Sequence, residues 1–360
     1  MKKYYVTSMI HRRKSRSVRV GNVLIGGDSP ITVQSMTTTK TADVASTVKQ
    51  IRRLENAGCE IVRVAIPGME DAKAVGEIKR RIRIPLVADI HFDYRLALEA
   101  IRRGADKIRI NPGNIGSRDR VKMVLEAAAE KGVPIRIGVN AGSLEKPLLK
   151  KHGGITAAAL VESAMGHVIL CEKLKFRSLV ISIKASDVPM TLDANRLLAK
   201  SCRYPIHLGV TEAGTTRTGA LRSAVGIGTL LAEGIGDTIR VSLTADPADE
   251  VRAGWEILKS LRLRKRGLTI ISCPTCGRLQ TNMIPVVEAA EKAFSRADKS
   301  MTVAIMGCAV NGPGEAKEAD IGIACGKREA LLFRKGKVVG KIREEDILKT
   351  LMEEVDRWQA

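Results

Sequence analysis

The sequence predicts an α/β fold, in which a (β/α)8 TIM barrel is followed by a small α+β domain. Eight β-branched runs, each with a polar ending and a helical stretch behind it, recur over about two hundred residues, and eight such units make a barrel of this kind. The alternation stops near residue 268. Because the basic stretch "SLRLRKRG" (260–267) lies at the change, we expect one domain over residues 1–263 and a second over residues 264–360.

The helical stretches between the runs carry their own end signals. "DVASTVKQIRRLENAG" (43–58) and "SRDRVKMVLEAAAEKG" (117–132) each close on the glycine expected just past a helix end. A doubly wound open sheet is the alternative, but no G-x-G-x-x-G opens a helix after an early strand, so the barrel is preferred. The expected strands lie within residues 31–37, 61–67, 85–92, 107–114, 134–142, 178–186, 205–214 and 238–247.

Two further segments have a recognisable pattern. Ahead of the first run, "SVRVGNVLIGG" (17–27) alternates around Gly21–Asn22 and predicts a β-hairpin that closes the floor of the barrel. In the second domain, "GCAVNGPGE" (307–315) holds glycine and proline and hardly a residue that favours a helix, so we expect a stiff turn there. Strands at "LTIIS", "MTVAIMGC", "ADIGIAC" and "EALLFRKGKVVGKI", a helix at "IPVVEAAEKAF" and a final helix complete that domain.

Composition limits the classes of protein to consider. The hydrophobic content of 44% is ample for a packed core, and no run of eighteen apolar residues is present. The basic N-terminus lacks the apolar stretch of a secretory signal, so we expect a cytoplasmic protein with no membrane partner. The net charge of +21 suggests nucleic-acid binding, but aromatic residues make up only 3% of the chain and the basic residues recur along its whole length. An anionic substrate, an acidic partner or a lysine-rich surface explains this charge equally well.

One face of the expected barrel strands is unusually polar. Barrel interiors are normally filled by branched apolar side chains, and unpaired buried cations cost several kcal/mol each. We therefore expect these residues near the C-terminal mouth, facing an anion that neutralises them. Basic residues at matching depth on four strands suit phosphate oxygens, and two polar residues complete the cradle: Arg63, Arg109, Arg136 and Lys184, with Asn140 and Ser242.

Three titratable residues near these strand ends are candidates for acid–base chemistry. Glu212, just past the seventh strand, is a carboxylate at the cationic mouth and a candidate catalytic acid or base. His91 and His207 are equally well explained as acid–base groups and as structural histidines.

Four of the seven cysteines gather late in the chain, which in a reducing compartment suggests metal binding. "CPTCGR" places Cys273 and Cys276 in a C-x2-C turn after a strand, and Cys308 follows another strand. With Cys325 as a fourth ligand the site is a structural zinc site; with Glu315 it is an iron–sulfur cluster that has one replaceable oxygen ligand. The residues alone leave both alternatives open.

The motifs "CPTCGR", "GCAVNGPGE", "ADIHF", "RINPGN", "RIGVN", "SIKASD" and "VTEAG" resemble those of the bacterial 4-hydroxy-3-methylbut-2-enyl diphosphate synthases, over nearly the whole chain. The resemblance implies a [4Fe-4S] cluster on Cys273, Cys276 and Cys308, with Glu315 as an unusual fourth ligand. It implies that 2-C-methyl-D-erythritol 2,4-cyclodiphosphate is the substrate and that its diphosphate is held by Arg63, Arg109, Arg136, Asn140, Lys184 and Ser242.

The same resemblance implies a reaction and partners. The reaction is a reductive ring opening with loss of a hydroxyl, fed by reduced flavodoxin or ferredoxin, in a homodimer where one subunit's second domain caps its partner's barrel. Since a carboxylate leaves iron more readily than a thiolate, Glu315 is expected to be catalytic as well as a ligand. An RNA-binding protein with a zinc ribbon and a phosphate-sugar aldolase are the competing interpretations of the residues; no nucleic-acid partner is expected under the reductase interpretation.

Overall fold

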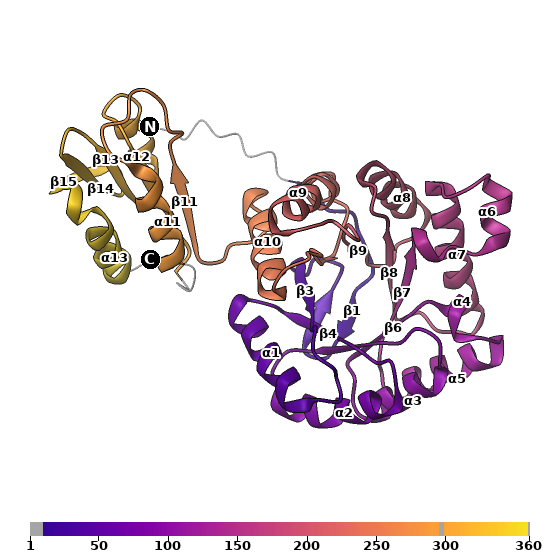
Figure 1. The fold of residues 1–360 in the computed structure, drawn as a ribbon. Helices are drawn as coiled ribbons and strands as arrows, with labels where there is room; N and C mark the ends of the chain where they lie inside the picture. The colour runs from indigo at the N-terminus through magenta and orange to yellow at the C-terminus, as the bar shows by residue number, and fades with distance from the viewer. Residues whose placement is uncertain (1–9, 295–298, 359–360) are drawn as a thin grey trace. The chain divides into compact units, whose positions relative to one another are not determined.

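The computed structural model describes residues 10–294 and 299–358, and the chain divides into two compact units, Met1–Arg264 and Lys265–Ala360 (Figure 1). The first unit is built around a parallel sheet of eight strands in the order β8-β7-β6-β5-β4-β3-β10-β9. A further parallel bridge between Ile181 and Ile206 joins the two ends of this sheet and closes it into a barrel. The predicted (β/α)8 barrel is therefore confirmed.

Each of the eight expected runs contains one strand of the barrel. The strands alternate with helices that surround the sheet, as the order of the elements requires. The strands are β3 (Thr32–Met36), β4 (Ile61–Ala65), β5 (Leu86–Asp89), β6 (Lys107–Ile110), β7 (Ile135–Asn140), β8 (Leu179–Lys184), β9 (His207–Leu208) and β10 (Thr238–Ile239).

Several helices of this unit begin at a residue whose side chain caps the first turn, and α1 is an example. In α1 the Asp43 side chain accepts a hydrogen bond from the Ser46 N–H, and the helix ends at Gly58 with a φ of 100°, a left-handed conformation that suits glycine. The helices are α1 (Val44–Ala57), α2 (Met69–Arg81), α3 (Tyr94–Arg102), α4 (Pro112–Ile115), α5 (Arg118–Glu130), α6 (Lys146–His152), α7 (Ala157–Lys173), α8 (Val188–Ser201), α9 (Thr216–Ala232) and α10 (Pro247–Ser260), with a 3-10 turn at Ala141–Ser143.

The two faces of the barrel strands differ in chemistry. Residues that alternate along each strand form the main hydrophobic core with the surrounding helices, among them Val62, Val64, Ile108, Ile110, Ile135, Ile137, Ile181 and Ile183. The residues between them point into the barrel, because successive side chains of a strand face opposite ways. That interior face is polar: Gln34, Asp89, Lys107, Arg109, Arg136, Ser182, Lys184 and His207 are all buried.

A β-hairpin closes the N-terminal end of the barrel, as expected. Strands β1 (Val18–Val20) and β2 (Val23–Ile25) pair antiparallel around the turn at Gly21. Val20 and Ile25 pack in one cluster with Ile61 and Val87, which belong to the interior face near the beginning of β4 and β5. The hairpin therefore supplies apolar contacts where the strands start, and the polar interior lies beyond it.

The second unit is a five-stranded sheet with helices. β11 (Leu268–Ser272), β12 (Met301–Met306) and β13 (Ile321–Cys325) run parallel, and β14 (Glu329–Arg334) and β15 (Lys337–Arg343) continue the sheet antiparallel. Helices α11 (Met283–Phe294) and α13 (Ile347–Arg357), the latter preceded by a 3-10 turn at Glu344–Asp346, contribute to the core beside this sheet.

The segment expected to be a stiff turn is partly helical. Helix α12 spans Gly312–Glu318, so the expectation of a turn without a helix over "GCAVNGPGE" is wrong. Pro313 lies in the first turn, where a missing N–H leaves no hydrogen bond unmade, and the residues from Glu315 onward favour a helix. The expectation failed because it considered a window that ends at Glu315, three residues before the helix does.

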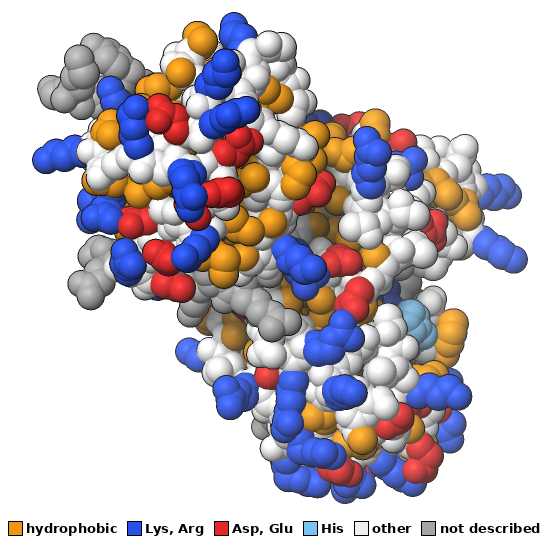
Figure 2. All heavy atoms as spheres, turned by 60° about the vertical axis from the view of Figure 1, so that its left-hand side comes forward, with side chains coloured by type: hydrophobic (Ala, Val, Ile, Leu, Met, Phe, Trp, Pro, Cys, Tyr) orange, Lys and Arg blue, Asp and Glu red, His pale blue; other side chains and the backbone are white. Residues whose placement is uncertain are grey.

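On the face that Figure 2 shows, basic side chains are spread out rather than gathered in one field. Figure 2 shows lysine and arginine side chains across the visible face with acidic ones between them. This distribution agrees with a sequence in which 60 lysines and arginines stand against 39 aspartates and glutamates along the whole chain. Among the described residues, no helix combines the length and the apolar character that crossing a membrane requires.

Candidate active site

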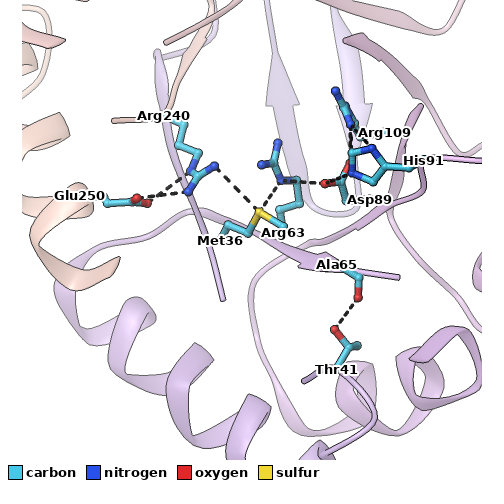
Figure 3. A network of polar contacts seen from close by, with 9 residues as sticks. All are labelled: Met36, Thr41, Arg63, Ala65, Asp89, His91, Arg109, Arg240 and Glu250. Carbon is cyan, nitrogen blue, oxygen red and sulfur yellow. Dashed lines mark hydrogen bonds and ion pairs between the residues drawn. The ribbon is translucent and has the colours of Figure 1, made fainter. Parts of the chain in front are cut away.

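A buried carboxylate organises one side of the barrel interior. Asp89, at the end of β5, accepts a hydrogen bond from Arg109 Nη1 at 3.1 Å, and its other oxygen lies 3.7 Å from Arg63 Nε (Figure 3). His91 Nε2 lies 3.3 Å from the same carboxylate. Burial alone raises the pKa of Asp89, but the two arginine charges and the hydrogen bond with His91 hold it below its ordinary value, so this side chain is a carboxylate.

A second buried carboxylate holds another arginine. Glu250, on α10, accepts hydrogen bonds from Arg240 Nη2 at 3.2 Å and from Ser35 Oγ at 2.9 Å. Arg240 and Arg63 both approach the sulfur of Met36, at 3.9 Å and 2.9 Å (Figure 3). The sulfur therefore lies between two guanidinium groups that are anchored on different acids.

In the described part of the chain, two of the predicted phosphate-binding residues form no ion pair with an acid, although the charge of Asp89 acts on one of them, Arg136. Arg136 is 2% exposed and Lys184 is 7% exposed. Burial and the charges of neighbouring arginines hold the pKa of both groups well below its ordinary range. Within the described part of the chain, Nε and Nη1 of Arg136 have no hydrogen-bond partner. Groups of this kind are expected to bind an anion, because a buried cation is otherwise unfavourable.

Two glycines leave room for these cations. A Cβ built on Gly138 lies 2.6 Å from Arg109 Nε, and one built on Gly209 lies 2.7 Å from Lys184 Nζ. Real Cβ atoms do not approach other atoms this closely, so the side chains of Arg109 and Lys184 occupy space that only a glycine leaves free. No pattern in the sequence indicates this role of Gly138 and Gly209.

The predicted phosphate-binding residues do not lie at one level. The strand register pairs Arg109 with Arg136, while Lys184 pairs with Asn140 farther toward the carboxyl ends of β7 and β8. Arg136 is the second residue of β7, nearer its start than expected. Arg63 faces the same interior through its contact with Asp89. Asn140 and Ser242 are half-buried, as residues at the mouth of the interior would be.

The candidate acid Glu212 lies past the carboxyl end of β9, with its side chain exposed. Its φ of 54° is left-handed, a conformation that costs a non-glycine residue about 1 kcal/mol or more. Such strain persists where the surrounding structure holds a residue in place, and it is common at functional sites.

The interior also contains residues that the sequence analysis missed. Lys107 and Glu250 are both buried there, and neither was among the expected site residues. Lys107 had a signal, because it lies two residues before Arg109 and so shares its face of the strand. Glu250 had none, because an acid in the first turn of a helix ordinarily stays in solvent.

In the second unit, a cavity of about 330 Å³ brings the predicted metal ligands together. Cys273 follows β11 and Cys308 follows β12, two adjacent parallel strands whose carboxyl ends meet at one edge of the sheet. Cys276 lies on the loop after Cys273, and Glu315 lies in the first turn of α12. All four side chains line the cavity.

Backbone N–H groups point at two of these sulfurs. The Gly307 N–H donates to Cys273 Sγ at 3.1 Å. The N–H groups of Asn311 and Val310, followed by that of Gly312, lower the pKa of Cys308. The lowered pKa of Cys308 favours its thiolate, which is the form that binds metal. The donor set and its hydrogen bonds therefore fit a thiolate-held cluster, whose sulfurs typically accept such bonds.

Cys325, the alternative fourth ligand, lies in the core of the second unit. It is fully buried, its thiol lies 3.6 Å from the sulfur of Met283, and burial raises its pKa to about 11. It is not among the residues that line the cavity. Over residues 10–294 and 299–358, no three His, Cys, Asp or Glu side chains lie close enough together to hold a single metal ion.

The chain has the features of a class of barrel enzymes with two sites. One site is the cationic interior of the (β/α)8 barrel, and the other is the thiol-lined cavity of the α+β unit that follows it. The chain belongs to the GcpE family. The family model described as the GcpE TIM-barrel domain matches residues 15–255, and that of the GcpE protein C-terminal domain matches residues 269–357.

Curated relatives match over nearly the full length. A protein of Ruminiclostridium cellulolyticum is 58% identical over 346 residues, which are 96% of this chain and 98% of the relative. A protein of Geobacter sulfurreducens is 58% identical over 349 residues, or 97% of this chain and 99% of the relative. Both relatives are named 4-hydroxy-3-methylbut-2-en-1-yl diphosphate synthase (flavodoxin).

Proposed function

We propose that this chain converts 2-C-methyl-D-erythritol 2,4-cyclodiphosphate to 4-hydroxy-3-methylbut-2-enyl diphosphate, as an iron–sulfur enzyme of isoprenoid biosynthesis that takes electrons from reduced flavodoxin or ferredoxin. The observation that carries this proposal is the cavity on which Cys273, Cys276, Cys308 and Glu315 converge. The names of the full-length relatives support the same reaction. Residues 1–263 bind the substrate and residues 264–360 bind a [4Fe-4S] cluster.

The residues that line the cavity support a cluster rather than a zinc ion. In a cluster each ligand binds a different iron, so the ligands lie farther apart than those of a single ion. A fourth ligand that lines the cavity, Glu315, fits better than Cys325, which is part of the core.

In the barrel, the diphosphate lies against the buried basic groups. Arg109 and Arg63 are fixed by Asp89, which leaves their remaining N–H groups for phosphate oxygens. Arg136 and Lys184 gain the negative partner that they lack in the ligand-free interior. Asn140 and Ser242 donate further hydrogen bonds at the mouth.

The reaction takes two electrons and one proton. The bond between carbon 2 and the ring phosphate breaks, the hydroxyl on carbon 3 leaves as water, and a double bond forms between these carbons. When bound, the cluster supplies the electrons. Glu212, held in place past the end of β9, donates the proton to the leaving hydroxyl. Glu315 would hold one corner of the cluster, and because a carboxylate is a harder and weaker ligand for iron than a thiolate, it could be displaced by the substrate.

We further propose a cytoplasmic homodimer, in which the barrel of one subunit works with the cluster of the other. The donor proteins carry acidic surfaces, and the basic surface of this chain favours encounters with them.

Anaerobic purification and a turnover assay test the proposal. We expect a brown protein with about four irons and four sulfides per chain, which turns over the cyclodiphosphate with reduced flavodoxin. Cys276→Ser is expected to lose both iron and activity, while the matched variant Cys325→Ala keeps both, since Cys325 does not line the cavity. A colourless protein with one zinc ion, or an active Cys276→Ser variant, contradicts the proposal.

A further inference from the structure

Two buried titratable residues of the barrel interior are not among the groups assigned to the diphosphate. Lys107 is the first residue of β6 and His207 is the first residue of β9, so both lie at the strand starts. Both are 0% exposed. Lys107 shares the interior face with Arg109, and His207 pairs in register with Thr238 of β10.

Neither side chain has the partner that a structural role requires. Among the described residues, Lys107 Nζ and both ring nitrogens of His207 lack a hydrogen-bond partner. A structural histidine is ordinarily held by at least one hydrogen bond, and a structural lysine is ordinarily paired with an acid. These two residues therefore remain unexplained by the ligand-free fold.

The charges around these residues are basic. Arg136 and Arg63 act on Lys107; Arg136, Lys184, Lys107 and Arg63 act on His207. Burial, followed by these charges, holds the pKa of both groups well below its ordinary value. In the ligand-free barrel the neutral forms are therefore favoured, because another positive charge there meets only repulsion from these neighbours.

An anion reverses this balance. When a diphosphate binds Arg136 and Lys184, its negative charge offsets the repulsion that Arg136 exerts on Lys107 and that both groups exert on His207. The charged forms then become favoured, and protons enter from solvent.

We propose that Lys107 and His207, called here the deep tier after the position of Lys107, take up protons as the diphosphate binds to the neighbouring basic groups. The deep tier adds positive charge to the site only when a ligand is present. Linkage is reciprocal, so if anion binding drives proton uptake, proton loss weakens anion binding. The affinity for the anion therefore falls as pH rises through the range in which the deep tier loses its protons. The fall is about tenfold per pH unit for each proton taken up. The inference rests on the proposed function in one respect, that the anion is the cyclodiphosphate.

Titration calorimetry tests the deep tier on the full-length protein without reductant. Each phosphate of the cyclic ligand is a strong acid with no proton near neutral pH, so protons taken up must bind to the protein. We expect the binding heat to differ between HEPES and Tris buffers, whose ionisation enthalpies differ. Lys107→Met and His207→Gln are each expected to reduce that difference. Lys122→Met, an exposed lysine on α5, leaves it unchanged.

The outcomes separate the two proposals. Equal heats in the two buffers, with binding intact, overturn the deep tier. Unchanged proton uptake in both Lys107→Met and His207→Gln overturns it as well, and the wild-type measurement needs no variant to fold. Sulfate, which also carries no proton near neutral pH, is the second probe. If sulfate binds with proton uptake while the cyclodiphosphate does not bind, the deep tier stands and the proposed substrate is wrong.

Discussion

Arg109 Nη1 and Asp89 Oδ1 form a buried hydrogen bond of 3.1 Å between adjacent strands of the barrel. Asp89 is also the acid nearest to Arg63, so its removal leaves two buried guanidinium groups without it. We expect Asp89→Asn to lower the free energy of unfolding by about 3 kcal/mol, measured by urea denaturation. The matched variant Asp193→Asn breaks an exposed ion pair with Arg196 and is expected to cost less than about 0.5 kcal/mol. If both variants lost the same free energy of unfolding, the buried ion pairs of Asp89 would contribute no more to stability than an exposed pair does.

The same carboxylate sets a pH dependence of stability. The pKa of Asp89 is lowered in the folded protein, so its contribution is fully present above the unfolded-state pKa of about 4. It is lost as pH falls from there through the folded pKa, because the unfolded chain binds the proton first. Urea unfolding at a series of pH values below about 5 is therefore expected to show a steeper loss for the wild type than for Asp89→Asn. If the free energies of unfolding of the two proteins fell in parallel below about pH 5, Asp89 would not be the source of this pH dependence.

Gly209 should not tolerate a side chain. A Cβ there meets both Lys184 Nζ and the backbone oxygen of Arg240 at 2.7 Å, and backbone atoms have little freedom to move. We expect Gly209→Ala to displace the Lys184 ammonium and to weaken cyclodiphosphate binding by about tenfold or more, since a lost charged contact is worth about 1.5–3 kcal/mol. Gly228→Ala, in α9 with open space around its Cβ, is the control and is expected to bind normally. If both variants bound the cyclodiphosphate with equal affinity, Gly209 would not be needed to leave space for the Lys184 ammonium.

The carboxylate of Glu315 is expected to matter for turnover more than for metal retention. Glu315→Cys places a thiolate in the first turn of α12, where it completes a four-thiolate set. Because thiolates bind iron more tightly, we expect retained iron and sulfide with turnover reduced by about a hundredfold or more. Glu318→Cys adds a thiol to the same helix away from the cavity and is expected to be active. Normal turnover in Glu315→Cys would mean that this ligand need not leave.

The proposed exchange between subunits predicts complementation. Cys276→Ser removes a cluster ligand, and Lys184→Met removes a phosphate-binding group, so each variant alone is expected to be inactive. If each barrel works with its partner's cluster, a mixed dimer has one intact pair of sites. We expect mixtures that have exchanged subunits to regain up to about a quarter of the wild-type activity, by random pairing. A mixture that exchanges subunits, as shown by mass-tagged chains, but stays inactive would contradict the arrangement.

The barrel could be predicted from the sequence because its signals are local. Each strand is a β-branched run of a few residues followed by a helical period, and alternation alone identified the polar face that carries Arg109 and Lys184. The helix α12 was missed because its signal lies mostly after the glycines and the proline at its start. Helix propensity is judged over a stretch of residues, and the stretch considered ended at Glu315, three residues before α12 ends.

The missed parts of the site depend on contacts between distant segments. Glu250 reaches the interior from α10 and meets Arg240 and Ser35, the latter more than two hundred positions away in the chain. Gly209 matters because of the side chain of Lys184 on a neighbouring strand. No property of these residues in isolation announces such neighbours, since glycines and helical acids are common in solvent.

The apolar contacts of the barrel lie between its strands and its helices, while its centre is filled by polar groups. The residues that fold the chain are therefore largely different from those that recognise its ligand. Exchanging an unpartnered cation in the centre for an apolar residue leaves the surrounding core in place, and it removes the cost of burying that charge. The barrel is for this reason a suitable starting point for laboratory redesign toward other anions, because its specificity can be altered independently of its folding.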